Sequence, residues 1–278
     1  KENNERVQRK LGVDFLKFRS DWKLVRRLML ESLKRKGDFD WHAHVGTFAY
    51  PMQMAVKYKI PLIFWGEPSS EYTAYYGYDK HEEIDERRNE RLNNLGITAE
   101  DMAGFLGDDV SLRDFSPYIF PKNNELREIK CKSVPLGEFV PWNVKEHYKI
   151  INQELGWEGA PVEGVPPEFP WEKIEYQLQG PRDYLKFIKR GYSRVTHLTS
   201  IEIWNNRMTR EDAAKLIESY EGKRPASLDF ILKIIGISED KWNEIALTQS
   251  IPPYKHDFSK TEKAEPLEDM EKWEWNPC

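Results

Sequence analysis

The sequence predicts an α/β fold in which a parallel β-sheet flanked by helices is followed by a mostly helical carboxyl-terminal region. Residues 60–65 (IPLIFW) form a continuous apolar run, typical of a parallel strand that is covered on both faces. Strand-like and helix-like segments alternate up to Leu155, whereas the apolar spacing beyond residue 171 is helical. The chain is therefore expected to divide into residues 1–155 and 156–278.

Three segments have strand patterns. Residues 11–18 (LGVDFLKF) alternate apolar and polar side chains, and residues 129–140 suggest a strand followed by a tight loop. Residues 60–65 are closed by Gly66. Ligands of open α/β sheets bind beyond the carboxyl ends of strands, so a pocket is expected where polar residues follow Gly66.

Two helices are expected before this strand, at 22–36 and at about 47–59, because apolar residues recur there at helical spacing. The charged segment 79–91 is interpreted as a solvated helix or lid. The Pro- and Gly-rich segment 156–170 is expected to be a loop, and the tail beyond Pro252 to lie on the surface. The other predicted helices are 95–107, 143–155, 171–190, 209–221, 226–235 and 238–247.

The composition excludes several classes of protein. A net charge of −5 and a pI near 5.8 argue against broad binding to nucleic acid, although a local basic cluster could still bind an anion. No apolar run approaches the ~20 residues of a membrane span. The two cysteines, Cys131 and Cys278, cannot build a disulfide framework or a CxxC metal knuckle. We expect a cytoplasmic protein without membrane or nucleic-acid partners and leave a homo-oligomer open.

Ionisable and aromatic side chains are densest in residues 38–46 (DFDWHAHVG) and 65–76 (WGEPSSEYTAYY). His42 and His44 would face the same way in extended chain and could hold a metal, or could simply form hydrogen bonds at a helix entry. Glu67, directly after the buried strand, could act as a general base or bind a ligand, or could cap the next turn.

A second candidate site lies in residues 187–194 (FIKRGYSR). Lys189, Arg190 and Arg194 around Gly191 would suit a phosphate or carboxylate, although a solvated helix end explains them equally well. Arg207, next to two asparagines, adds a polar group without a specific assignment.

Several segments resemble the N-acetyl sugar amidotransferases of bacterial surface-polysaccharide and flagellar-glycan synthesis, including lipopolysaccharide O-antigen and pseudaminic acid. They are WHAHVGTFAYPMQMAVKYKIPLIFWGEPSSEYTAYYGY, GITAEDMAGFL, VPLGEFVPWNVKEHYKIINQELGW, YLKFIKRGYSRVTHLT and EGKRPASLDFIL, which together span nearly the whole chain. This family belongs to the PP-loop ATP pyrophosphatase superfamily. The resemblance implies that residues 1–155 are the carboxyl-terminal part of an adenine nucleotide alpha hydrolase-like sheet.

The resemblance also implies a reaction. ATP with Mg²⁺ would activate the acetamido oxygen of a sugar by adenylation, and ammonia from a glutaminase partner would displace AMP to give an acetamidino sugar. The acceptor would be a free or nucleotide-linked N-acetyl sugar. The implied roles are catalysis for Glu67 and Glu71, nucleotide binding for Trp65, Gly66, His42 and His44, and substrate binding for Tyr72, Lys189, Arg190, Arg194 and Arg207.

The sequence departs from the family pattern in two places. The SGGxDS phosphate loop is absent, so the chain is expected to begin partway into the fold and not to hydrolyse ATP alone. Asp40 and Ala43 stand where related proteins often carry CxxC; Asp40 could be a weak oxygen ligand, but a zinc or iron–sulfur site is not expected. A binding or scaffold subunit of the same fold is the alternative. A tRNA-thiolating PP-loop enzyme is disfavoured by the negative charge and the missing thiols.

Overall fold

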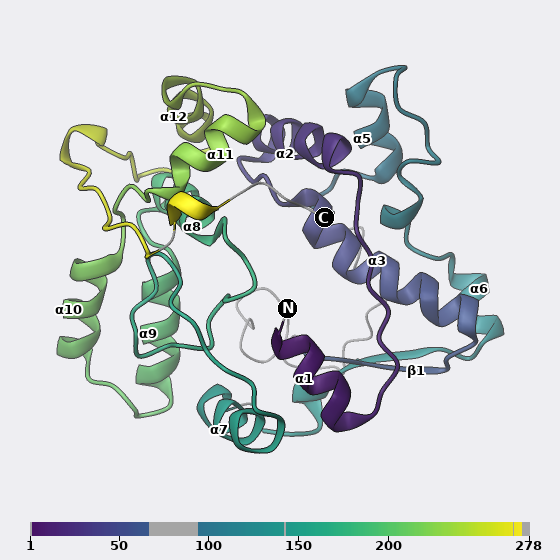
Figure 1. The fold of residues 1–278 in the computed structure, drawn as a ribbon. Helices are drawn as coiled ribbons and strands as arrows, with labels where there is room; N and C mark the ends of the chain where they lie inside the picture. The colour runs from purple at the N-terminus through teal and green to yellow at the C-terminus, as the bar shows by residue number, and fades with distance from the viewer. Residues whose placement is uncertain (1, 67–93, 142, 269, 274–278) are drawn as a thin grey trace. The chain divides into compact units, whose positions relative to one another are not determined.

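The computed structural model describes residues 2–66, 94–141, 143–268 and 270–273. The chain forms two compact units, a larger one of Lys1–Trp22 with Val144–Cys278 and a smaller one of Lys23–Asn143. The described residues are mostly helical, with eleven α-helices and a parallel sheet of two strands (Figure 1). The domain boundary predicted after residue 155 does not coincide with the boundaries of these units. The larger unit contains residues 1–22 and the helix that ends at Leu155, together with the later helices.

The smaller unit is built around a long helix, α3. Helix α2 has the predicted bounds, but α3 begins at Trp41 rather than near residue 47. The Asp38 carboxylate accepts the Asp40 N–H at 2.8 Å, and the Asp40 carbonyl accepts the His44 N–H, so the first turn forms before the apolar pattern starts. Its helices are α2 (Trp22–Lys36), α3 (Trp41–Tyr58), α5 (Ala99–Leu106), η3 (Ser116–Tyr118), α6 (Asn123–Glu128) and η4 (Leu136–Glu138).

Two short strands pair in this unit. Strand β1 (Leu62–Trp65) lies parallel to β2 (Lys132–Pro135), which confirms the predicted strand and its direction. The expectation that β1 is buried on both faces is wrong. Trp65 is 6% exposed and packs on Phe48 of α3, whereas Leu62 and Phe64 on the opposite face are 46% and 55% exposed.

The predicted strand at 11–18 is also wrong. Helix α1 (Glu2–Leu11) ends there, the Gly12 N–H bonds to the Gln8 carbonyl, and residues 13–21 are irregular. A strand is stable only with a hydrogen-bonded neighbour, and no described strand pairs with this segment. Its alternating apolar side chains, including Phe15, are about half exposed.

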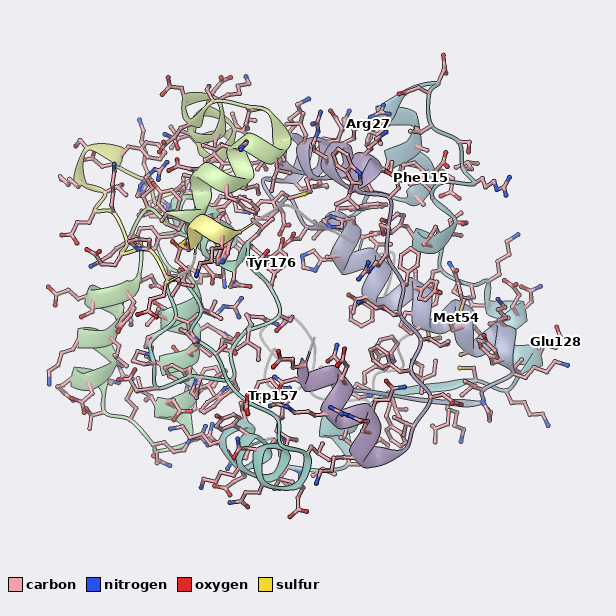
Figure 2. The ribbon with its side chains drawn as sticks, in the orientation of Figure 1. Arg27, Met54, Phe115, Glu128, Trp157 and Tyr176 are labelled. Carbon is pink, nitrogen blue, oxygen red and sulfur yellow. The ribbon has the colours of Figure 1, made fainter. Side chains whose placement is uncertain are left out.

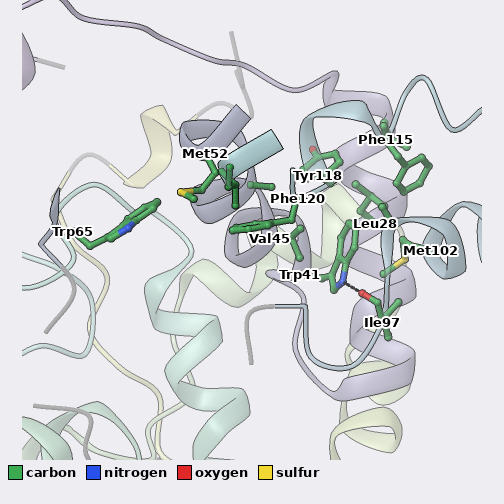
Figure 3. Close-up of a cluster of buried hydrophobic side chains, with 14 residues drawn as sticks. Leu28, Trp41, Val45, Met52, Trp65, Ile97, Met102, Phe115, Tyr118 and Phe120 are labelled. Carbon is green, nitrogen blue, oxygen red and sulfur yellow. Dashed lines mark hydrogen bonds between the residues drawn. The ribbon is translucent and has the colours of Figure 1, made fainter. Parts of the chain in front are cut away.

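A large apolar cluster among the described residues holds the smaller unit together (Figure 3). Trp41 is fully buried at its centre, and its indole N–H lies 3.1 Å from the Asn94 carbonyl and 3.0 Å from that of Ile97. At one edge of the unit, Arg27 on α2 donates two hydrogen bonds to the Asp109 carboxylate, at 2.6 and 2.8 Å (Figure 2). These bonds tie α2 to the segment that follows α5.

The larger unit is helical. Residues 156–178 contain no helix, which confirms the predicted loop over 156–170; Trp157 and Tyr176 lie on this irregular segment (Figure 2). Helices α9 and α10 pack side by side, and α11 and α12 both contact α8 (Figure 1). Its helices are α1, α7 (Val144–Leu155), α8 (Gln179–Arg190), α9 (Arg194–Trp204), α10 (Arg210–Tyr220), α11 (Ser227–Ile235), α12 (Glu239–Thr248), η5 (Phe258–Lys260) and η6 (Met270–Lys272).

The predictions for this unit are largely confirmed, with two differences. The helix expected over 171–190 starts only at Gln179, and helix α9 was not expected at all. Five of the eleven residues of α9 are β-branched, and such side chains have low helix propensity, so tertiary packing supports this helix. None of the described helices is long and apolar enough to span a membrane.

Candidate functional site

The two histidines predicted to face the same way do not do so. Both lie in α3, where residues two apart point to nearly opposite sides of the helix. The His44 Nε2 atom is 3.8 Å from Asp38 Oδ2. Burial, reinforced by the nearby His44, lowers the pKa of His42 to about 4, so His42 is neutral at pH 7. The pair therefore does not form a common binding face.

Asp40 is only 2% exposed and occupies the N-cap of α3, in keeping with a structural role. Among the described residues, no three His, Cys, Asp or Glu side chains gather closely enough to hold a metal ion. The assignment of Asp40 as a weak metal ligand thus has no geometric support.

The end of β1 is described only up to Gly66. The Trp65 indole N–H donates to the Ser133 hydroxyl at 2.7 Å and so ties β1 to β2. Apart from the chain neighbours of Gly66, no atom of the described residues lies within 4 Å of the position that a Cβ on this glycine would occupy. Glu67, Glu71 and Tyr72 lie outside the described residues, and their roles stay predictions.

The described residues concentrate positive charge where α8 meets α9. Arg182, Lys186 and Arg190 are spaced four residues apart and lie along one face of α8. Arg194 and His197 lie in the first turn of α9, three residues apart. We call these five side chains the α8–α9 cluster. The sequence prediction included Arg190 and Arg194 but missed Arg182, Lys186 and His197, although the four-residue spacing was visible.

Two acidic partners, of which Asp183 is buried, hold Arg194 in place. Its Nη1 atom donates to the Glu172 carboxylate at 2.9 Å, and its Nε lies 3.3 Å from Asp183 Oδ2. Asp183 is 9% exposed and also accepts a 2.7 Å hydrogen bond from the fully buried Gln179. Two charge-assisted contacts from different segments thus fix the guanidinium before any ligand arrives.

Lys186 is in a different situation. Its side chain is partly buried, and it forms no ion pair among the described residues; its ammonium lies 5.8 Å from the centre of the Tyr192 ring. Burial, together with the positive charges of Arg194, Arg190 and Arg182, lowers the pKa of Lys186 to about 8 against the opposing effect of Asp183. An anion bound here would relieve this repulsion.

The same positive charges also act on His197. Burial lowers its pKa to about 4, and the charges of Lys186 and Arg194 act in the same direction. The imidazole is therefore neutral at pH 7 and can donate one hydrogen bond without adding charge.

The turn between α8 and α9 is held rigidly. Gly191 adopts a left-handed φ of 76°, and a Cβ at this position would lie 2.7 Å from Cδ2 of Tyr254. Glu221 accepts hydrogen bonds from the Ser193 and Thr196 N–H groups and so caps α9. Lys189 lies on α8 beside this turn, and its carbonyl accepts the Ile251 N–H at 2.8 Å.

Arg207 forms hydrogen bonds with a residue outside the α8–α9 cluster. It donates to both carboxylate oxygens of Glu202 at 2.7 and 3.1 Å, and Lys145 pairs with the same carboxylate. Glu202 is 3% exposed. This geometry favours a structural role for Arg207, and its assignment to substrate stays a prediction.

Comparison with known proteins places the α8–α9 cluster in a recognised domain. Residues 169–271 match the family described as LPS biosynthesis protein WbpG-like, C-terminal domain, a stretch that includes α8 to α12. This region is therefore related to a lipopolysaccharide biosynthesis protein. A search of curated proteins found no match.

Proposed function

We propose that this chain is part of an ATP-dependent amidotransferase that converts the acetamido group of an N-acetylated sugar to acetamidino during lipopolysaccharide O-antigen biosynthesis. The observation that carries the proposal is the match of residues 169–271 to a domain of a lipopolysaccharide biosynthesis protein. The position of the α8–α9 cluster inside that stretch supports an anionic substrate or nucleotide.

The proposed reaction balances without a redox partner. The acetamido oxygen attacks the α-phosphorus of ATP and releases pyrophosphate, and ammonia then adds to the activated carbon. Loss of AMP carries away the former amide oxygen and a proton leaves the nitrogen, which gives the amidine. A carboxylate that orients ammonia and accepts its proton would speed the second step, and Glu67 and Glu71 are the candidates from the sequence.

Among the described residues, those at the end of β1 are relevant to ATP binding. Gly66 leaves open space at the end of β1, which is compatible with a ribose or phosphate there, with Mg²⁺ as the metal that accompanies the nucleotide. The Trp65 indole N–H is already bonded to Ser133, so its polar atom is not available to the nucleotide. A glutaminase partner as the ammonia source belongs to the proposal.

The test uses the full-length protein with ATP, Mg²⁺, ammonium chloride and a panel of free and nucleotide-linked N-acetyl sugars. We expect a sugar product with NH in place of the acetamido oxygen, and equal amounts of AMP and pyrophosphate. The same sugars without the acetyl group are the control and should give no product. A protein that binds the sugar without releasing pyrophosphate would instead be a binding subunit, and release of ADP would contradict adenylation.

A further inference from the structure

We propose that the turn between α9 and α10 is a carbohydrate-binding site, in which the indole of Trp204 stacks on a pyranose ring and the side-chain amides of Asn205 and Asn206 bond to the polar groups of that sugar. The kind of sugar, an N-acetylated one, rests on the proposed function. Three features of the turn support the site. They are the exposure of the indole, the amides beside it and the rigidity of the backbone that carries them.

The indole of Trp204 is open to solvent. Trp204 is the last residue of α9, and it is 72% exposed, the highest value among the large apolar residues that the structure describes. Its ring stacks on no other described ring, and its indole N–H has no acceptor among the described residues. Tryptophan is well buried in most proteins, because its ring offers a large apolar area that is stabilised when it is covered. The exposed face of Trp204 is therefore available to a ligand.

The surroundings of the indole indicate what covers it. Asn205, Asn206 and Thr209, which share the turn with Trp204, are all exposed and polar. The centre of a protein–protein interface needs several neighbouring apolar side chains, and this turn does not offer them. A pyranose has one face of C–H groups, which the electron-rich face of an aromatic ring attracts, and a rim of polar groups. A sugar therefore fits a single indole with polar neighbours better than a protein surface does.

The two amides beside the indole can bond to that polar rim. The Asn205 Nδ2 atom donates to the Ile201 carbonyl at 2.8 Å, which orients the amide and leaves its oxygen without a donor among the described residues. The Asn206 amide bonds to no described residue, so both its donors and its acceptor are available. A primary amide can donate to a sugar hydroxyl and accept from a hydroxyl or an acetamido N–H.

The backbone that carries these side chains is fixed before a ligand arrives. The N–H groups of Asn206 and Arg207 donate to carbonyls in the last turn of α9, at 2.9 and 2.8 Å. The Arg207 guanidinium adds two hydrogen bonds to Glu202 on α9, and Thr209 caps the start of α10. Asn206 has a left-handed φ of 54°, which asparagine adopts more readily than most residues. Such a preformed turn loses little conformational entropy when it binds a sugar.

The first test is a titration of the ¹⁵N-labelled full chain with N-acetylglucosamine, followed through the indole N–H signals in NMR spectra. The chain has ten tryptophans, and the signal that is missing from the spectrum of Trp204→Phe belongs to Trp204. We expect this signal to shift as sugar is added. Glycerol, which has hydroxyl groups but no pyranose ring, is the control and should leave the signal in place.

The second test compares the affinity of variants for N-acetylglucosamine by saturation-transfer NMR. Trp204→Ala removes the stacking surface, so we expect affinity to fall about tenfold. Asn206→Gly removes one amide but keeps the backbone, because glycine readily adopts a left-handed φ, and we expect a smaller loss of about threefold. Trp22→Ala is the matched control, since Trp22 is also exposed but lies on α2, and it should bind as the wild type does. Thermal melts establish that each variant is folded.

The site inference fails if the Trp204 signal does not move with sugar, or if folded Trp204→Ala binds the sugar as the wild type does. In the amidination assay, a raised KM for the sugar in Trp204→Ala with an unchanged KM for ATP would identify the bound sugar as the substrate. An unchanged KM together with lost sugar binding would identify a separate glycan site. Sugar binding at Trp204 without amidination of any N-acetylated sugar would refute the proposed function alone; amidination by a protein whose Trp204 signal ignores the sugar would refute the site alone.

Discussion

Replacing Arg207 by methionine tests whether this guanidinium holds the fold together or binds substrate. The change removes two hydrogen bonds to Glu202, a residue that is 3% exposed, and leaves its carboxylate with Lys145 as the cationic partner among the described residues. Charge-assisted hydrogen bonds contribute about 1.5–3 kcal/mol each, and breaking a buried pair costs about 3–5 kcal/mol. Because Lys145 remains, we expect Arg207→Met to lower the free energy of unfolding by about 2–4 kcal/mol.

The assay is urea unfolding of the full chain, followed by tryptophan fluorescence. Lys145→Met is the comparison; the Lys145 side chain is 35% exposed, so we expect a smaller loss of about 1 kcal/mol or less. Burial raises the pKa of Glu202, but the bonds from Arg207 and Lys145 outweigh it and leave the pKa lowered. The stabilisation is therefore present above the unfolded-state pKa and is lost as pH falls, so the difference between Arg207→Met and wild type should shrink in acid.

An Arg207→Met protein that unfolds like the wild type at pH 7 would refute this account of Glu202. If the same variant also had a raised KM for the sugar, Arg207 would return to the substrate-binding set.

Three further predictions concern stability. Gly191→Ala should cost about 1–3 kcal/mol, because it places a Cβ against Tyr254 at a left-handed φ; Gly104→Ala, in open space on α5, is the control, and equal melting temperatures would contradict the turn geometry. Trp41→Phe should cost about 1–3 kcal/mol, because the Ile97 carbonyl loses the indole donor and the Asn94 carbonyl keeps only the Ile97 N–H, and an unchanged urea midpoint would contradict this. The pKa of His197 is lowered to about 4, so its stabilisation is present above the ordinary value of 6.5 and is lost as pH falls toward 4; His197→Gln should flatten this pH dependence in urea titrations, and an unaltered slope would count against the buried neutral imidazole.

Local signals predicted the helices well. The bounds of α2 were predicted because its apolar residues recur at helical spacing and Gly37 stops it, and α11 and α12 followed from the same kind of pattern. The predictions from sequence were wrong where an element depends on contacts with residues that are distant in the chain. Residues 11–18 alternate like a strand but have no described strand to pair with, and α9 forms despite its β-branched residues.

The candidate site was predicted in part for the same reason. Arg190 and Arg194 stood out by their charge around Gly191, whereas the roles of Lys186 and His197 depend on burial and on charges from another helix. The start of α3 decided the outcome for His42 and His44. In a helix that begins at Trp41 the two side chains point to different sides, whereas in an extended chain they would point the same way.

The central claim is that the amide oxygen of an N-acetylated sugar is activated as an adenylate. The most direct measurement supplies the full-length protein with ATP, Mg²⁺, ammonium and an N-acetyl sugar whose acetamido oxygen carries a heavy-isotope label. We predict that the label appears in the phosphate of AMP, in an amount equal to the amidino sugar formed. Label that stays in the sugar, or that appears in inorganic phosphate, would contradict the proposed reaction.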